Sequence, residues 1–595
     1  MIISLFSIPN ESISLIQNNV DSRPVRLGIQ TIVKYMEYSG YDKDTCDYYD
    51  VATILPDDEK IREYLLRVNP TVIGMSAVIS SSYGQVKRIS RIIRETLKDC
   101  FIVVGGNMAI TYHVLLRKTD VDICVLGPGE KSWIFLLEYH KENGRKIIHE
   151  TLKEVNGIAY KYNDNLYSNG YGEKITNLQN PDYDLFKFPF MKANGQTEWE
   201  HNKITAEYIS LGKNVASLNT AKGCTATCTF CQRSSPGYDV YDINDIEKYL
   251  IYLVETFDVG FIRIEDENFG SDKKHAREIA KLFKKYNLFW NAGGVRCVNV
   301  NDDDIIFYGN HNCVGLKYGV ESGSQVILDV MEKKFTVEKV LSRIVNTMKN
   351  GMLSPLMMLL GLPGENNNTV RETGHMLGEL CLQIGVYPSE FFSSGYMSAN
   401  LLIIFPGTPA YDYARAVGIF KNIDEEEQYL EKLVEHKAGI YTYINITGMP
   451  LKEVMFWKRL MILEATRYFY ENISKKSEAT KNIMNILSAS KLKYENVSNY
   501  YKKKNKVIYY KMKVTQFMGA FFTARIVSFL PSSLVDGFFK NIFWYSHLIF
   551  SYLKRQRQHN ATKVPLLEEI YPGIYDMDKK RIDRSLKRIV PKLNL

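Results

Sequence analysis

The sequence predicts an α/β protein in three parts: an N-terminal doubly wound parallel sheet, a central partial (β/α)6 TIM barrel and a C-terminal mostly α-helical domain. Two observations predict this. In residues 1–145 and 206–440, short apolar runs alternate with segments of helical spacing, as parallel strands and their crossover helices do. After residue 441 the strand period is lost and helical spacing prevails. A chain of 595 residues has room for about three domains.

The first part contains the short continuous apolar runs that are typical of buried parallel strands, at Ile2–Ile8, Val72–Ser76, Phe101–Val104 and Val121–Leu126. Helices are predicted at Pro24–Tyr38 and Lys131–His140. Ligands of such sheets bind beyond the carboxyl ends of the strands. The residues at these strand ends are mostly small or hydroxyl-bearing, so a bulky ligand can approach the backbone. The candidate contacts are Ser76, Ser80, Ser81, Gly105, Gly106, Gly127, Gly129 and Glu130. A generic nucleotide fold, or a sheet without a ligand, is the alternative interpretation.

A connector is predicted for residues 146–205. Within it, Asn156–Tyr160 could add a strand, whereas Asn177–Phe190 is rich in turn residues and is expected to wrap the junction between domains.

Six strand-like runs follow in residues 206–440, which fits an incomplete (β/α) barrel. They are Val215–Thr220, Gly260–Glu265, Phe289–Gly293, Gly315–Val320, Pro355–Gly361 and Asn400–Phe405. The chemistry of such a barrel takes place at the carboxyl ends of its strands.

The loop after the first barrel strand carries three closely spaced cysteines, Cys224, Cys228 and Cys231. Three thiolates suit a cubane iron–sulfur cluster in which one iron keeps an open position. A structural zinc site needs four ligands, and the next cysteine is Cys297. A disulfide framework fits poorly because the chain has nine cysteines, three of them crowded here.

This cysteine motif, with the aromatic Phe230 before the last cysteine, resembles the signature of the radical S-adenosylmethionine (SAM) superfamily. The resemblance implies a [4Fe-4S] cluster on the three cysteines. Its fourth iron would bind the amino and carboxylate groups of SAM, and electron transfer would give a 5′-deoxyadenosyl radical.

Residues at the other strand ends have the chemistry that SAM requires. Glu321 suits ribose hydroxyls or an amino group, Arg296 can pair with a carboxylate, and glycine lets the backbone approach adenine. The predicted SAM contacts are Phe230, Glu265, Arg296, Glu321, Ser322, Gly361 and Pro406. Each carboxylate alone is more simply a solvated loop end or a helix cap, and Asp266 and Glu267 stay ambiguous. No catalytic residue is assigned.

The sheet placed before the cluster motif, together with Gly319–Ser324, Gly361–Glu365 and Pro406–Pro409, resembles the cobalamin-dependent (class B) radical SAM enzymes. The resemblance implies that residues 1–145 bind cobalamin and that residues 206–440 form the radical SAM barrel. Many cobalamin domains carry a histidine that ligates cobalt from below. No histidine occurs before His113, so that position would be empty, filled by water or faced by another side chain.

The basic character of the chain belongs to its end. Residues 501–595 carry 19 Lys and Arg against 6 Asp and Glu, a balance of +13 within a total of +8. We expect residues 441–595 to form a helical, basic domain that includes the amphipathic helix Leu451–Asn472 and the run Lys502–Lys506. Aromatic stripes at helical spacing are usually core, and a basic run is usually solvated. An anionic or amphipathic substrate, or a membrane surface, is the alternative.

The function implied by the resemblance is C-methylation of an unactivated carbon in a peptide or other natural-product intermediate, through the adenosyl radical and methylcobalamin. A cobalamin-associated radical cyclase or rearrangement enzyme, and a non-catalytic corrinoid or iron–sulfur sensor, are the alternatives. The expected partners are a small-molecule or peptide substrate and an external electron donor of the flavodoxin or ferredoxin type, with no nucleic acid. Scattered cysteines and the lack of a signal peptide or a transmembrane segment indicate the cytoplasm, with peripheral membrane contact open.

Overall fold

The computed structural model describes residues 1–9, 27–42, 45–78, 80–175, 191–192, 213–233, 237–393, 396–433 and 443–473, together with residues 531 and 534. The predicted turn-rich stretch Asn177–Phe190, the basic run Lys502–Lys506 and the segment Phe517–Gln558 lie outside these residues.

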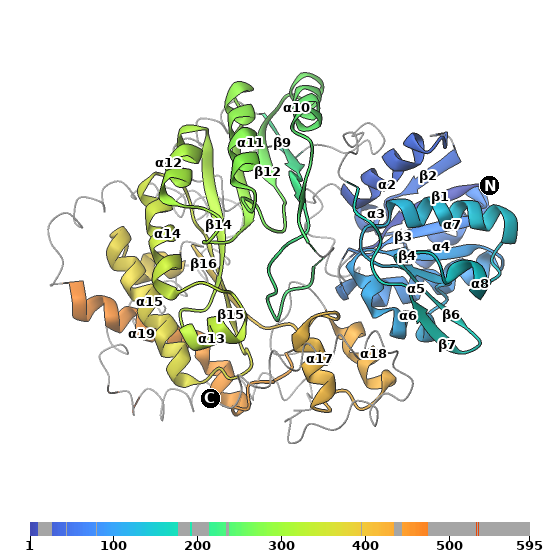
Figure 1. The fold of residues 1–595 in the computed structure, drawn as a ribbon. Coiled ribbons are helices and arrows are strands. Elements are labelled where there is room, and N and C mark those ends of the chain that lie inside the picture. Colours follow the sequence, from blue (N-terminus) through green and yellow to red (C-terminus); the bar gives the residue numbers. More distant parts are fainter. Residues whose placement is uncertain are drawn as a thin grey trace, which may run out of the picture.

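The first sheet has the order β2-β1-β3-β4-β5-β6-β7 (Figure 1). Its first five strands are parallel: β1 (Ile3–Ser7), β2 (Cys46–Tyr49), β3 (Val72–Ser76), β4 (Phe101–Gly105) and β5 (Ile123–Val125). The hairpin of β6 (Ile158–Tyr162) and β7 (Asn165–Ser168) continues the sheet antiparallel. The predicted doubly wound sheet is therefore present. The strand proposed at Asn156–Tyr160 belongs to this sheet, which extends to Ser168 rather than ending near residue 145.

Helices cover both faces of this sheet. One face packs against α2 (Leu27–Tyr38) and α7 (Glu130–Asn143) in a separate apolar cluster that includes Ile29, Val33 and Trp133. The other face packs against three helices that bury Ile61, Ile89 and Val114 respectively: α4 (Asp58–Val68), α5 (Tyr83–Thr96) and α6 (Tyr112–Lys118). Burying both faces explains why the strands are continuously apolar.

The second sheet has the order β16-β15-β14-β13-β12-β9-β8. Six strands are parallel neighbours: β9 (Asn214–Leu218), β12 (Val259–Ile264), β13 (Phe289–Val295), β14 (Cys313–Glu321), β15 (Leu356–Leu360) and β16 (Met397–Leu401). The short strand β8 (Met191–Lys192) pairs antiparallel with β9. The sheet therefore forms the predicted six-stranded partial barrel.

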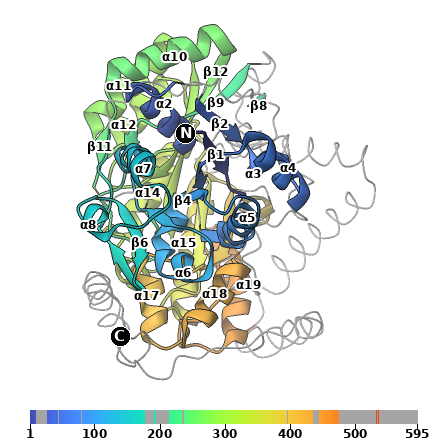
Figure 2. The same ribbon diagram turned by 90° about the vertical axis from the view of Figure 1, so that its right-hand side faces the viewer.

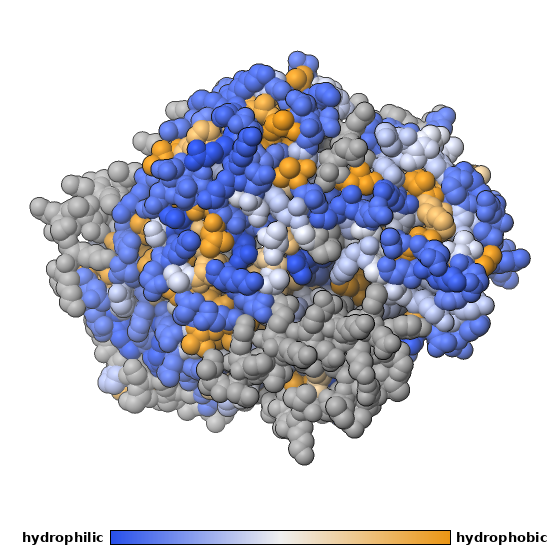
Figure 3. Space-filling model, viewed as in Figure 1, coloured by the Kyte–Doolittle hydropathy of each residue, from blue (hydrophilic) through white to orange (hydrophobic). Residues whose placement is uncertain are grey.

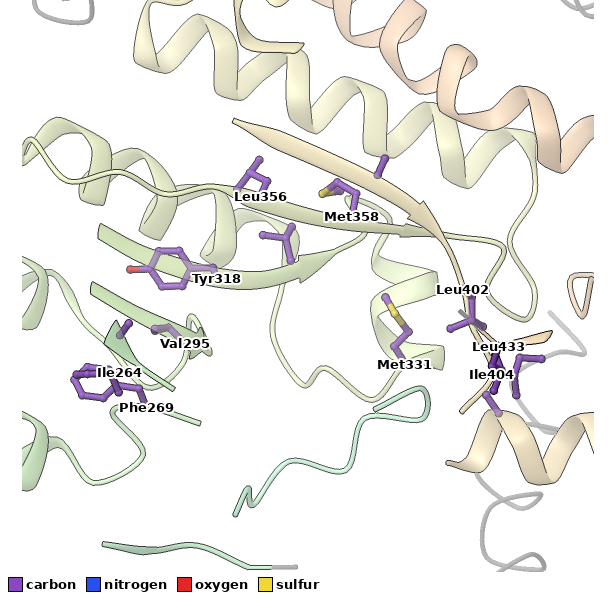
Figure 4. Close-up of a cluster of buried hydrophobic side chains, with 14 of the residues drawn as sticks. Ile264, Phe269, Val295, Tyr318, Met331, Leu356, Met358, Leu402, Ile404 and Leu433 are labelled. Atoms are coloured by element: carbon purple, nitrogen blue, oxygen red, sulfur yellow. The ribbon is translucent and has the colours of Figure 1, made fainter. Parts of the chain in front are cut away.

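The sixth strand was placed too late in the sequence. The prediction was Asn400–Phe405, whereas β16 pairs with β15 from Met397 to Leu401. The apolar residues beyond it misled the prediction because Leu402 and Ile404 are buried in the core without continuing the ladder (Figure 4).

Polar caps start the helices that surround the barrel. Asp242, Asp272, Asn301, Thr336 and Asn366 each accept hydrogen bonds from the exposed amides of the following first turn. They begin α10 (Ile243–Phe257), α11 (Lys273–Lys285), α12 (Asp302–Asn310), α14 (Val337–Lys349) and α15 (Asn367–Ile384). The caps fix where each strand-to-helix loop ends and so help to position the site loops.

The predicted amphipathic helix Leu451–Asn472 is α19, which packs along α15 (Figure 1). Its aromatic and aliphatic side chains are core residues, as Phe456, Trp457 and Phe469 are buried. In the view of Figure 3, hydrophilic residues cover most of the outer helices and leave only separated apolar patches. None of the helices that the structure describes is long and apolar enough to cross a membrane.

Two short helices join the barrel to the first sheet. These are α17 (Pro409–Ala416) and α18 (Ile423–Lys432), which follow the sixth barrel strand. In both ribbon views α18 lies beside α6, and it also contacts α5 (Figures 1 and 2). The chain thus returns from the end of the barrel to the first domain.

Candidate active site between the two sheets

The cysteine loop leaves the barrel after β9 and is anchored by a buried carboxylate. Asp266 follows β12 and accepts hydrogen bonds from the Thr220 amide at 2.6 Å, the Thr220 hydroxyl at 2.5 Å and the Ala221 amide at 3.1 Å. Burial raises the pKa of Asp266 to about 6, although these three donors act in the opposite direction. The residue that the sequence left ambiguous therefore positions the start of the loop.

The far side of the cysteine loop is braced by the segment after α13 (Gln325–Val330). The Thr229 amide donates to the Met331 carbonyl at 3.2 Å, and the Thr227 hydroxyl donates to Glu332 Oε2 at 2.8 Å. The first turn of α17 adds a third contact, because the Ala410 amide donates to the Thr229 carbonyl at 2.9 Å. The loop is held by three separate parts of the barrel.

The three cysteines of the loop lie close together. Cys224 is buried, Cys228 is half-buried and Cys231 is exposed. Burial raises the pKa of the Cys224 thiol, the Ala226 amide donates to its sulfur at 3.3 Å and lowers the pKa, and the neighbouring Cys228 raises it again. Desolvation also raises the pKa of the Cys231 thiol, to about 12, and the neighbouring Cys228 and Cys224 raise it further.

Three of the predicted SAM residues converge on a lysine that sequence reasoning missed. Lys333 is 5% exposed, and its ammonium lies 5.4 Å from the centre of the Phe230 ring and 3.3 Å from Glu321 Oε1. Arg296 donates to the Lys333 carbonyl oxygen. Glu321 holds its place in the left-handed region at φ 67°, which is uncommon for a residue with a side chain. No sequence motif pointed to Lys333, since Glu332-Lys333-Lys334 looks like a solvated charge run.

Other predicted SAM residues shape the loops themselves. The Ser322 hydroxyl meets that of Thr373 on α15 at 3.2 Å. A Cβ at Gly361, where φ is 89°, would stand 2.5 Å from the Tyr443 hydroxyl. The Pro406 carbonyl accepts a hydrogen bond from Gln232 Nε2 at 2.8 Å. The predicted SAM residue Glu265 has an exposed side chain.

A second buried carboxylate, Glu365, supports the loop at Gly361. It accepts from the Gly361 amide at 2.6 Å and from the Leu362 amide at 3.2 Å. Burial raises the pKa of Glu365 to about 8, while the two amides lower it.

The carboxyl edge of the first sheet has close backbone approaches at its glycines. A Cβ at Gly106, where φ is 89°, would overlap the Ala77 carbonyl oxygen, and one at Gly129 would stand 3.1 Å from Val125 Cγ1. Gly105 has open space, with Val125 Cβ 4.0 Å from a Cβ built there, and Gly127 has φ 75°. Ser76 ends β3, and the side chain of Ser80 lies outside the described residues.

Several polar atoms on this edge are buried without a hydrogen-bond partner in the described part of the chain. They are both amide atoms of Gln30, in the first turn of α2, the hydroxyl of Ser81, which follows β3, and Glu130 Oε2, which follows β5. The other oxygen of Glu130 pairs with Lys222, two residues before Cys224. Glu130, predicted as a cobalamin contact, thus also joins the first sheet to the cysteine loop.

The two carboxyl edges meet at the residue after the third cysteine. Gln232 Nε2 donates to the Pro406 carbonyl and, at 3.4 Å, to the Asn107 carbonyl beyond β4. Next to it, a Cβ on Gly407 would overlap Ile110 of the same β4 loop. The loops of both sheets therefore border a common region.

Comparison with known proteins identifies both halves of this region. Residues 13–133 match the B12 binding domain family, and residues 218–377 match the Radical SAM superfamily. The anaerobic magnesium-protoporphyrin IX monomethyl ester cyclase of Rubrivivax gelatinosus is 26% identical over 351 residues, which span 58% of this chain and 60% of that protein. Cytidylyl-2-hydroxyethylphosphonate methyltransferase of Streptomyces wedmorensis is 22% identical over 432 residues, 66% of this chain and 80% of that protein.

The chain therefore combines a match to the B12 binding domain with a match to the Radical SAM superfamily. Two solved structures share the fold. The radical SAM methyltransferase TsrM from Kitasatospora setae, with cobalamin and a [4Fe-4S] cluster bound, has a TM-score of 0.52 at 16% identity and covers 70% of this chain and 75% of its own. The cobalamin-dependent radical SAM enzyme OxsB, with aqua-cobalamin and SAM bound, has a TM-score of 0.58 at 14% identity. The match covers 100% of this chain and 83% of that one.

The cysteine loop fits a cubane cluster rather than a single ion. Among the described residues, no three His, Cys, Asp or Glu side chains are arranged to hold one metal ion. A cubane binds each cysteine at a different iron, so its ligands stand farther apart than those of one ion. Three neighbouring thiols without a fourth protein ligand suit that cluster.

The edge of the first sheet likewise fits a corrinoid. An unpartnered buried polar atom costs about 1–3 kcal/mol, so several at one edge favour a polar ligand that satisfies them. Cobalamin has many amide side chains, which donate and accept as Gln30, Ser81 and Glu130 require. His113 is not free for cobalt in this arrangement, because its Nε2 lies 2.6 Å from Glu426 Oε1 on α18.

Proposed function

We propose that this enzyme methylates an unactivated carbon of a peptide or other natural-product intermediate. The observation that carries the proposal is the contact of Gln232 with the loops of both sheets, Asn107 on one side and Pro406 on the other. It brings the predicted cobalamin edge and the predicted SAM edge to one region. When bound, the cluster supplies the electron that cleaves SAM, and cobalamin supplies the methyl group.

The chain's own residues would bind and orient these groups. We infer that Cys224, Cys228 and Cys231 hold the cluster, and that the remaining predicted SAM residues line the barrel edge. The ammonium of Lys333, held over Phe230 and beside Glu321, adds positive charge where the SAM carboxylate is expected. Two anchors keep this edge in place, namely Asp266 under the cysteine loop and Glu365 under Gly361. A preorganised site loses little free energy to reorganisation during the reaction.

A radical cyclase is the second candidate, and the similarity to the magnesium-protoporphyrin cyclase supports it. The products from SAM separate the candidates without knowledge of the substrate. The full-length protein, reconstituted with iron, sulfide and cobalamin and then reduced, is incubated with SAM. A methyltransferase should form S-adenosylhomocysteine as well as 5′-deoxyadenosine. Formation of 5′-deoxyadenosine alone would favour the cyclase, and formation of neither would favour a sensor.

We further propose that an external one-electron donor of the flavodoxin or ferredoxin type reduces the cluster, that the enzyme works in the cytoplasm and that it has no nucleic-acid partner. The balance of −5 over the first 500 residues supports the last point for that part of the chain, because nucleic acids bind basic surfaces. Supplying a reduced flavodoxin should start SAM cleavage, and cleavage only with chemical reductants would count against a donor of this type.

A further inference from the structure

The inner face of the barrel carries polar side chains that the proposed SAM site does not use. The outer faces of β12, β13 and β14 pack under the helices through Ile262, Ile264, Trp290, Ala292, Leu316 and Tyr318; Figure 4 shows Ile264 and Tyr318 among them. Successive side chains of a strand point to opposite faces of the sheet. Arg263, Asn291 and Lys317, which alternate with these core residues, therefore belong to the inner face.

The strand register places these side chains near one another. Ser217, Arg263, Asn291 and Gly315 stand opposite one another in a single row across β9, β12, β13 and β14. Lys317 is two residues beyond Gly315 on the same strand. One step below the row, an apolar cluster of Val215, Phe261 and Val314, with Phe289 packed against it, closes the amino end of the barrel. The row of polar residues thus lies next to an apolar layer at the amino end of the strands.

Two of the donors in this region have nothing to bind within the described part of the chain. Asn291 is 3% exposed, and its Nδ2 has no hydrogen-bond partner. Lys317 is half-buried, and no ion pair or hydrogen bond is found for its ammonium. Gly293 leaves room beside them, because a Cβ built there would meet only the Ile264 carbonyl oxygen, at 3.9 Å. A buried donor without an acceptor is costly, which favours a ligand that supplies one.

We propose that Lys317, Asn291 and Arg263 bind an anionic group of the substrate, a carboxylate or a phosphoryl group, inside the barrel. An ammonium, an amide N–H and a guanidinium are all donors, which is the set that an anion needs. The inference rests on the proposed function, since it places the substrate in the barrel.

The proposed anion site lies deeper than the residues predicted to bind SAM. Lys317 precedes Glu321 by four residues on β14, and a strand rises about 3.3 Å per residue, so the two Cα atoms are about 13 Å apart. The acidic neighbours are Glu265, two residues beyond Arg263 and exposed, and Glu321, which faces Lys333. A substrate anchored by its anionic end would extend toward the edge, where its reacting carbon lies near the cysteine loop and the first sheet.

Calorimetric binding of two small anions, inorganic phosphate and acetate, to the full-length reconstituted protein tests the proposal without turnover. The variants are Lys317→Met, Lys317→Arg and Asn291→Ala, with Lys349→Met on the exposed end of α14 as the matched control. We expect the parent to bind at least one of the two anions. Lys317→Met should lower the affinity for that anion at least about tenfold, and Asn291→Ala should lower it about three- to tenfold. Lys317→Arg should retain binding, and Lys349→Met should match the parent.

Binding of phosphate alone would indicate a phosphoryl substrate, and binding of acetate alone a carboxylate; both outcomes support the site. Equal affinity in the parent and Lys317→Met, or no binding of either anion by the parent, would overturn the proposal. The SAM dissociation constant and iron content are measured on the same samples. Weaker SAM binding with unchanged anion binding would assign Lys317 to the SAM site instead, which also overturns it. Absence of S-adenosylhomocysteine would reject the methyltransferase function and leave the anion result standing.

Discussion

The two carboxyl edges that meet at Gln232 differ in how their polar groups are used. At the barrel edge, Asp266 and Glu365 accept two backbone hydrogen bonds each, and Lys333 lies between Phe230 and Glu321. At the edge of the first sheet, Gln30, Ser81 and one oxygen of Glu130 are buried without partners among the described residues. The barrel edge is held mainly by hydrogen bonds among its own residues, although Glu365 Oε1 and Arg296 Nε are also buried without a partner among the described residues. At the first sheet, both amide atoms of Gln30 and the Ser81 hydroxyl have no partner in the described part of the chain. Variants at the two edges should therefore fail in different ways.

The largest expected effect is at the cysteine loop. Replacing Cys224, Cys228 and Cys231 by alanine should remove the bound iron and abolish SAM cleavage, because these three thiols are the predicted cluster ligands. Corrinoid binding should stay within about threefold of the parent, since the first sheet has its own contacts. Iron analysis, the visible spectrum and 5′-deoxyadenosine formation are the measurements. Cys46→Ser is the matched control, and an intact cluster in the triple variant would contradict the assignment.

The next largest effect is expected at the joint between the two domains, the contact of Glu426 on α18 with His113 on α6. Glu426 of α18 is fully buried and lies 2.6 Å from both His113 Nε2 and the Tyr411 hydroxyl. Although burial favours its neutral form, His113 and Arg415 hold the pKa of Glu426 down to about 2. A carboxylate with a depressed folded pKa contributes stability above its unfolded pKa, here near 4.5, and loses it as the pH falls toward 2.

Glu426→Gln should therefore lower the free energy of unfolding by about 3 kcal/mol at pH 7. The difference from the parent should shrink as the pH falls below about 4.5. Denaturant unfolding between pH 7 and pH 3.5 measures both. Glu278→Gln, in an exposed pair with Lys281, is the control and should change stability by less than about 1 kcal/mol. A difference that is constant over this pH range would show that ionised Glu426 does not stabilise the joint.

A smaller effect is expected where the first sheet has unpartnered groups. Gln30→Ala and Ser81→Ala each remove a side chain that we expect to bind cobalamin, and each should weaken cobalamin binding about three- to tenfold. Neither should lower stability by the amount typical of a lost internal hydrogen bond, because neither side chain has a hydrogen-bond partner in the described part of the chain. Equilibrium binding of hydroxocobalamin to the apoprotein measures the effect, with Gln85→Ala on α5 as control. Unchanged affinity in both variants would mean that the ligand does not reach this edge.

Most parallel strands of both sheets were predictable from sequence because buried parallel strands are continuously apolar. The edge strand β2 was not predicted, since its residues Cys46–Tyr49 are not continuously apolar and none of them is fully buried. Val72–Ser76 and Leu451–Asn472 were predicted with the bounds that the structure has. The roles of charged and amide residues were not predictable in the same way. Lys333 and Gln30 carry no pattern that separates them from solvated residues, and only the folded chain shows their burial. Asp266 stayed ambiguous because its partners, Thr220 and Ala221, are 45 or more residues away in sequence. Ser322 suited a ligand by its chemistry, yet its hydroxyl meets Thr373.

Neutralising the basic run should change substrate affinity only a few-fold. The run consists of Lys502, Lys503, Lys504 and Lys506 and lies outside the described residues. The +13 balance of residues 501–595 suggests that these lysines attract an acidic substrate by long-range charge. Neutralising all four to glutamine should weaken binding of an acidic peptide probe about two- to fivefold at low salt and hardly at all at high salt. Substrate-free SAM cleavage should not change. Equal low-salt affinity in parent and variant would identify the run as a solvated surface.

The last prediction is that replacing His113 leaves the spectrum of bound cobalamin unchanged, because we expect no histidine below the cobalt. No histidine precedes residue 113, and His113 Nε2 lies 2.6 Å from Glu426 Oε1. The electron paramagnetic resonance spectrum of cob(II)alamin bound to the parent should therefore show no hyperfine splitting from an axial imidazole nitrogen. His113→Gln, which keeps a donor for Glu426, should give the same spectrum while reducing stability. If the parent shows such splitting and the variant loses it, His113 must leave Glu426 to bind cobalt, and the joint between α6 and α18 must open when the corrinoid binds.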